Sequence, residues 1–225
     1  MTHVETLYTG KQQPYIMSIV NRIKDADFPN KIGFVAPIIS LSCIGVAILL
    51  SPNFTWIGNA LSDLGHYTRT DLGPYQLYAA MIFNVGLTLT GLLMLYFTIH
   101  LLQQIKEPAT KIALAIFSVS CIFLTAIGVF SENFSPTHFI VSVGFFLTFP
   151  FAMWAVGIGW LRFPRTRVFA IISLLLPFLS VYLWTQTWDG VAIPEIVTAL
   201  SAILWIWGVD WLHISGALSE FEKSS

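Results

Sequence analysis

The sequence predicts an all-α integral membrane protein, a bundle of six transmembrane helices with a short amphipathic helix in its first outer loop. The chain has 225 residues, of which 56% are hydrophobic and only 10% are charged. Soluble domains carry roughly 25% charged residues. Because a water-soluble fold of this size cannot hide so much apolar surface, we expect a lipid bilayer to surround the chain.

Six apolar stretches have the length that a membrane crossing requires. About twenty apolar residues are needed, since the hydrocarbon core is roughly 30 Å thick and a helix rises about 1.5 Å per residue. The expected helices cover residues 32–50, 75–101, 109–130, 138–161, 168–187 and 194–214. The predicted organisation is one transmembrane domain, 32–215, between a cytoplasmic N-terminal segment, 1–31, and a cytoplasmic tail, 216–225.

The positive charges predict the orientation of the bundle. Lys and Arg near helix ends are retained on the cytoplasmic side of a membrane. All of them except Arg69 precede the first helix or lie in the second loop, the fourth loop or the tail. We therefore expect a multi-pass protein of the cell membrane with both termini in the cytoplasm and the first, third and fifth loops outside. The net charge of −1, with dispersed basic residues, argues against a nucleic-acid partner.

The first outer loop is the segment richest in chemistry. If Thr55 caps a short helix, its polar side chains recur at helical spacing opposite its apolar ones. These polar residues are Asn59, Ser62, Asp63 and His66. One interpretation is an amphipathic helix lying flat at the membrane interface. The other is a functional site, because short Asn, Ser, Asp and His side chains suit directed hydrogen bonds or metal ligation.

Other polar residues are expected near the same side of the membrane. Glu132, His138 and Glu195 come from the third outer loop or from helix ends beside outer loops. Asn84 lies about ten residues into the second helix, where an amide must face the bundle or a wet cavity. Together with the first outer loop, these residues predict a polar cavity that opens outward and has its floor near Asn84.

The spacing of these residues suggests a metal-assisted enzyme site. Asp63 and His66 lie three residues apart, so both can reach one metal ion, and His138 would complete a three-ligand set. Such a set leaves a position for water, as a catalytic zinc site requires. As a lone residue, however, His138 also fits an interfacial hydrogen-bonding group.

The remaining residues have expected roles around that site. Asp63, His138, Glu132 and Glu195 are the candidate catalytic residues, with the two glutamates as general acid or base. Substrate-binding roles fall to Asn59, Ser62 and Asn84. The cofactor is left open, with zinc as the candidate.

Several of these residues carry a family resemblance. They are the segment Asn59-Ala-Leu-Ser-Asp-Leu-Gly65, Asn84 in the next helix, and Gly128-Val-Phe leading to His138. On these residues the chain resembles an uncharacterised family of prokaryotic six-helix membrane proteins, grouped as a domain of unknown function with a Ser-Asp-Leu-Gly signature. The resemblance covers about residues 32–214 and implies the six-helix fold without an established activity.

A more distant likeness is to the transmembrane hydrolases of the ceramidase and progestin-receptor type. These seven-helix proteins set a Ser, an Asp and three His around a metal, and the likeness implies such roles for Ser62, Asp63 and His138. The paired histidines of their last helix have no counterpart in this sequence. The likeness is therefore an analogy of fold and site.

Three functions remain open from the sequence. The first is a metal-assisted hydrolase or transferase of lipid-like substrates. The second is a protein that binds or transports a lipid or small amphiphilic ligand in the same cavity. The third is a structural partner whose outer helix and small-residue faces make protein contacts.

Overall fold

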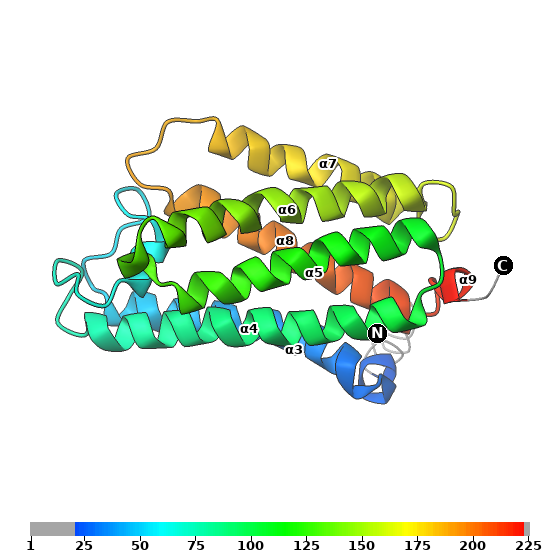
Figure 1. Ribbon diagram of the computed structural model, residues 1–225, viewed down its shortest axis with the longest axis horizontal. Helices are drawn as coiled ribbons and strands as arrows, with labels where there is room; N and C mark the ends of the chain where they lie inside the picture. Colours follow the sequence, from blue (N-terminus) through cyan, green and yellow to red (C-terminus); the bar gives the residue numbers. More distant parts are fainter. Residues whose placement is uncertain (1–20, 223–225) are drawn as a thin grey trace, which may run out of the picture.

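Six long helices run through residues 21–222, the part of the chain that the structure, a computed structural model, describes (Figure 1). They are α3 (Phe28–Leu50), α4 (Gln76–Gln104), α5 (Pro108–Val129), α6 (Thr137–Trp160), α7 (Arg167–Trp184) and α8 (Ala192–Ile214). Each is long and apolar enough to cross a membrane, and no strand occurs within residues 21–222. The predicted all-α membrane bundle is confirmed.

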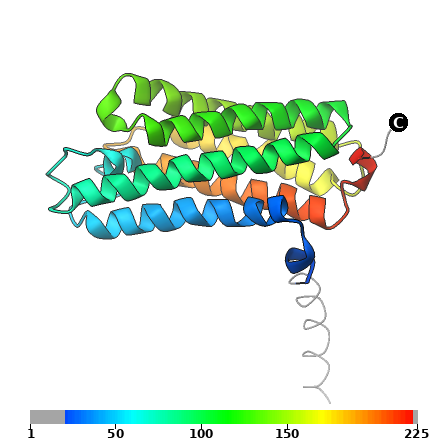
Figure 2. The ribbon, with the colours of Figure 1, turned by 60° about the horizontal axis from the view of Figure 1, so that its bottom comes forward.

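The helices form a closed bundle. Each packs against the next along the chain, and α8 contacts both α7 and α3 (Figures 1 and 2). Neighbouring helices are antiparallel, and all the connections between them are short except residues 51–75 between α3 and α4. The loops that include η1 (Leu61–Gly65) and η2 (Glu132–Phe134) lie at one end, which we call the cap end. The start of α3 and the short helix α9 (Ser219–Glu222) lie at the other, which we call the terminal end.

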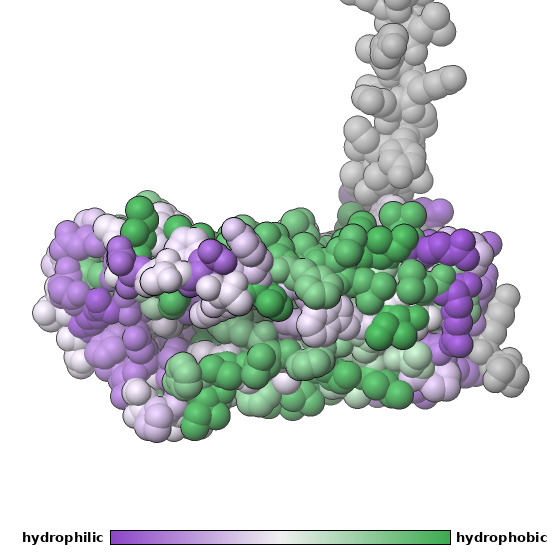
Figure 3. Space-filling model, turned by 90° about the horizontal axis from the view of Figure 1, so that it is seen from above, coloured by the Kyte–Doolittle hydropathy of each residue, from purple (hydrophilic) through white to green (hydrophobic). Residues whose placement is uncertain are grey.

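The outer surface of the bundle matches a bilayer. In Figure 3 a hydrophobic belt runs along the middle of the molecule, and hydrophilic residues gather at both ends. Large apolar side chains of the belt stay exposed, among them Leu49 at 82% and Ile158 at 70%. Such a continuous apolar surface is stable only against lipid tails. The chain is therefore a multi-pass membrane protein.

Local signals move some helix ends from their predicted positions. The first helix begins at Phe28 because the Asp27 side chain accepts a 3.1 Å hydrogen bond from the backbone N–H of Asn30 and Pro29 fits the first turn. Residues 1–20 and 223–225 of the two predicted cytoplasmic segments lie outside the described part of the chain. The described part of the tail packs on the bundle, with Leu218 and Phe221 each 1% exposed.

The loop between α3 and α4 differs from its prediction. The expected amphipathic helix after Thr55 is a turn followed by η1, a 3₁₀ helix of five residues. The Asn59 side chain accepts the backbone N–H of Thr55 at 2.9 Å, which holds the turn and delays the helix. Asn59 and Asp63 are buried along with Leu61 and Leu64, so this segment is a plug at the end of the bundle and does not lie flat on lipid.

Two glycines allow α4 and α5 to pack closely. A Cβ at Gly91 would lie 2.6 Å from the backbone nitrogen of Thr125, and a Cβ at Gly128 would lie 2.7 Å from that of Thr88. Backbone atoms cannot move aside as side-chain ends can. This small-residue contact is the one that membrane helices use when no hydrophobic force joins them.

We expect Gly91→Leu to destabilise the bundle by at least about 1–3 kcal/mol, because the new side chain must force α5 away. Thermal unfolding of the purified chain in mild detergent measures the loss. Gly45→Leu is the matched control, since a Cβ at Gly45 meets nothing within 4 Å. Equal unfolding temperatures for the two variants would contradict the close α4–α5 contact.

Candidate functional site

The buried carboxylate of Asp63 organises the cap end. Its Oδ2 accepts hydrogen bonds from Asn59 Nδ2 at 2.9 Å and from the backbone N–H of Ala60 at 3.0 Å. Its Oδ1 forms an ion pair with the Arg69 guanidinium, which also bonds the exposed Asp71. The 3₁₀ turn brings the Asp63 side chain back over Ala60, so the loop's own backbone supplies a donor. A charge this buried requires such partners.

Gln76, at the start of α4, fastens the other side of the loop. Its Nε2 lies 3.1, 3.3 and 3.1 Å from the carbonyl oxygens of Asp63, Leu64 and His66. Its Oε1 accepts the Ser51 hydroxyl at 3.2 Å. One amide therefore holds the end of η1 against the helix.

Asn84 has a different position from the one expected. Its Nδ2 donates to the Gly65 carbonyl at 2.8 Å, so it ties the loop to α4 and does not form a cavity floor. A Cβ at position 65 would lie 2.7 Å from Asn84 Oδ1, which explains the glycine. That Oδ1 is buried and has no hydrogen-bond partner in the described chain.

The loop before α8 packs on the same plug. The backbone N–H of Ala192 donates to the Asn59 carbonyl at 2.9 Å, and the glycine at 190 lets that loop approach the Asn59 backbone. In the first turn of α8, Glu195 Oε2 accepts the backbone N–H of Leu61 at 2.5 Å. A carboxylate near a helix N-terminus is electrostatically favoured. Glu195 thus joins α8 to η1.

Glu132 and Asp63 form a carboxyl pair. Glu132 Oε2 is buried and lacks a hydrogen-bond partner within residues 21–222. Burial, and then the Asp63 carboxylate to which a protonated Glu132 can donate, raise the pKa of Glu132 from 4.5 to about 7. One member of the pair can therefore hold a proton near neutrality while Arg69 balances the negative charge of Asp63.

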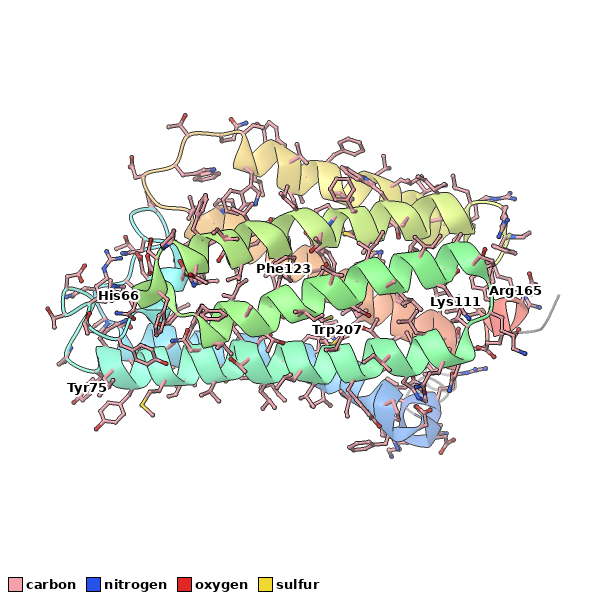
Figure 4. All side chains as sticks on the ribbon, in the orientation of Figure 1. His66, Tyr75, Lys111, Phe123, Arg165 and Trp207 are labelled. Atoms are coloured by element: carbon pink, nitrogen blue, oxygen red, sulfur yellow. The ribbon has the colours of Figure 1, made fainter. Side chains whose placement is uncertain are left out.

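The two histidines make separate contacts. His66, labelled at the cap end in Figure 4, has its Nδ1 3.3 Å from Asn133 Nδ2. His138 is buried, with Nδ1 2.7 Å from the Phe130 carbonyl and Nε2 3.4 Å from the Ser142 hydroxyl. The carbonyl of Phe130 ends α5, so His138 serves as its hydrogen-bond partner.

The structure does not assemble the expected metal ligands. Asp63 pairs with Arg69, and both ring nitrogens of His138 have protein partners. In the part of the chain that is described, no group of three or more His, Cys, Asp or Glu side chains is arranged to hold a metal. The set Asp63, His66 and His138 therefore gains no support for zinc from the geometry.

A cavity of about 120 Å³ lies inside the bundle, beneath η1. Side chains from α3, α4, α5, α6 and α8 line it, and most are apolar. The polar residues of the lining are Ser40, Ser62, Thr90, Ser142 and Glu195. Of the predicted site residues, only Ser62 and Glu195 reach it. The expected polar cavity is thus an apolar one, because Asp63, Glu132 and His138 do not line it. Asp63 and His138 instead hydrogen-bond to groups at the cap end.

Three residues of this site were missed. Arg69 entered only as an exception to the charge asymmetry, although a lone Arg six residues from Asp63 signals an ion pair. Gln76 lies at the start of the second predicted helix, and nothing in the sequence indicates that its side chain contacts three backbone carbonyl oxygens. Ser142 lies one helical turn after His138, a spacing at which side chains meet.

Fold and site together define a six-helix membrane protein with a hydrogen-bonded polar cap over an apolar interior. The chain belongs to the family described as protein of unknown function (DUF998), whose model matches residues 34–211. The predicted membership of an uncharacterised family is confirmed. No curated protein and no solved structure matches the chain.

We expect Asp63→Ala to cost at least about 1–3 kcal/mol of stability, because it leaves the Asn59 amide and the backbone N–H of Ala60 without their acceptor. Asp71→Ala removes the exposed partner of Arg69 and should cost less than about 1 kcal/mol. Thermal or denaturant unfolding of both variants checks this. Equal losses would mean that Asp63 is not the centre of the cap.

The raised pKa of Glu132 predicts a pH-dependent stability. The folded chain binds this proton more tightly than the unfolded chain, so stability falls as pH rises through the window from 4.5 to about 7. The loss should be on the order of 1 kcal/mol, because Glu132 is partly exposed and solvent screens it.

Glu132→Gln should remove that contribution, so that the variant matches wild type below the window and exceeds it above. Unfolding temperatures measured across the window test this. An unchanged pH profile in Glu132→Gln would show that another group titrates.

Proposed function

We propose that this protein binds a small amphiphile or a short apolar segment of a lipid in the cavity beneath the cap. The observation that carries the proposal is an apolar cavity with polar groups, Ser62 and Glu195, placed at its cap end. Ligand sites are mostly apolar with a few placed polar groups that fix orientation. This proposal corresponds to the second function left open by the sequence, binding or transport of a lipid or small amphiphile. It differs in that the cavity is mainly apolar, with Ser62 and Glu195 at one end.

The cavity size sets the class of ligand. Its volume of about 120 Å³ is comparable to an apolar protein cavity of roughly 150 Å³ that stays dry and binds benzene. A ring or a short alkyl segment fits, whereas a whole lipid does not. The carboxyl group of Glu195 and the hydroxyl of Ser62 favour a ligand whose polar end donates hydrogen bonds, such as an amine or alcohol.

We further propose that the cap end faces outward from the cytoplasm. The loops of the terminal end and the helix ends beside them carry Lys106, Lys111, Arg162, Arg165 and Arg167. In Figure 4, Lys111 and Arg165 lie at the opposite end of the bundle from His66. The positive charges thus gather at one end, which supports the orientation predicted from the loops.

A second candidate, a hydrolase or transferase of lipid-like substrates, is favoured by the Asp63–Glu132 pair. Two carboxyl groups with one shared proton are a common acid–base arrangement. The pair does not line the cavity, so a substrate would have to approach it from the aqueous side of the cap. Turnover of a lipid amide or ester that Glu132→Gln abolishes would replace the binding proposal with this one.

The cavity is tested by filling it. In Ala199→Phe a ring enters the cavity, and the variant should lose any lipid or amphiphile that native mass spectrometry finds bound to the wild type. Leu200→Phe, one residue along α8 at an exposed position, is the matched control and should keep it. Equal binding by both variants would contradict an internal site.

The polar end is tested with octylamine and octane as probes. Removing a charged hydrogen-bond partner costs about 1.5–3 kcal/mol, so Glu195→Gln should weaken octylamine binding by roughly tenfold or more. Octane binding should change little, because the apolar wall is intact. If both probes weaken equally, Glu195 supports the fold and does not bind the polar end.

A further inference from the structure

A second carboxyl group is buried near the terminal end of α8. Asp210 is 0% exposed, and neither of its carboxyl oxygens has a hydrogen-bond partner among the described residues. At the cap end, in contrast, Asp63 has three partners. An ionised carboxylate without partners is very costly in a dry interior, and ionisable residues inside a membrane commonly serve function.

Asp210 sits where three helices meet. A Cβ at Gly33 of α3 would lie 2.5 Å from Asp210 Oδ2 and 3.0 Å from the Phe97 ring of α4. The glycine therefore provides the space that the carboxyl group occupies. The apolar ring and the bare backbone supply no charge to balance it.

The titratable groups nearby already have other partners. His100 of α4 lies 2.9 Å from Asp27, which precedes α3. His213, on the same helix as Asp210, has Nδ1 3.1 Å from Asn30 Oδ1 and Nε2 3.5 Å from Glu222 of α9. None of these two histidines and two acids is hydrogen-bonded to Asp210.

Asp210 also lies directly below the cavity. Each of the three residues that meet there is one helical turn from a residue that lines the cavity on its own helix. The pairs are Gly33 with Pro37, Phe97 with Met94, and Asp210 with Ile206. On the side of Asp210 away from the cavity, His213 lies three residues further along α8, closer to the terminal end.

We propose that Asp210 is a proton-binding site inside the membrane, loaded from water at the terminal end by way of His213. A proton satisfies the carboxyl group without further ligands, whereas Na⁺, Ca²⁺ or Mg²⁺ needs several oxygen atoms around it. A neutral carboxylic acid is also the form that an apolar three-helix junction accepts. The proposal does not depend on ligand binding in the cavity.

Infrared spectroscopy of the full chain in nanodiscs tests the site at about pH 7, where an ordinary Asp is ionised. The wild type should show the carbonyl stretching band of a protonated carboxylic acid, which Asp210→Asn loses. Glu195→Gln and Glu132→Gln are matched controls that should keep this component. In heavy water the band should shift, and the shift should develop severalfold more slowly in His213→Phe.

A second pair of variants tests the site in a chain that keeps its Asp210. Gly33→Ala places a methyl group against Oδ2 and should shift the Asp210 band, whereas Gly45→Ala faces open space and should not. The proposal is overturned if no band depends on Asp210 or Gly33. It is also overturned if added Na⁺ or Mg²⁺ abolishes the band, because the site would then take a metal cation.

Discussion

The cap end depends on one constraint, the high cost of burying a charged group without partners, and on the way in which Asp63 meets it. A buried polar group needs hydrogen-bond partners within the protein or from ordered water. Asp63 finds them by gathering an amide, a backbone N–H and a guanidinium from its own loop. Gln76 and Glu195 then join that loop to α4 and α8. The ends of separate helices are thereby joined by hydrogen bonds to one short segment.

Buried polar groups that lack a hydrogen-bond partner indicate function more directly than those that have one. A satisfied group such as the Asn59 amide has its partners used up by structure. Glu132 and Asp210 retain buried carboxyl oxygens without partners in the described chain, at opposite ends of the bundle. A fold tolerates such groups only if a proton, a ligand or a change of conformation satisfies them at some stage. The proton-binding proposal for Asp210 therefore starts from an unsatisfied carboxyl group and not from a motif match.

The sequence predicted the fold well and the site only in outline. The six helices follow from length and hydropathy, which the bilayer dictates residue by residue. It also placed Asn59, Asp63 and Glu195 near one another, because charge asymmetry assigned their loops to one end. It could not predict that Asn59 would stop the expected helix, since a side chain bonding to its own backbone competes with helix formation only by a small margin. The ion pair between Arg69 and Asp63, which the lone arginine did signal, removes the basis for a metal set.

Helix α8 links the two ends of the molecule. Glu195 and Asp210 are fifteen residues apart on it, which corresponds to about 22 Å along the axis and places them within roughly 60° of one face. The cavity lies along the same helix between them, bounded by Glu195 at the cap end and by Ile206 one turn before Asp210. Helix α8 also closes the bundle by packing against α3. A change in the charge of either carboxyl group therefore acts on a helix that forms part of the cavity wall and also closes the bundle. The proposed ligand site and the proposed proton site therefore share a single helix through which each can influence the other.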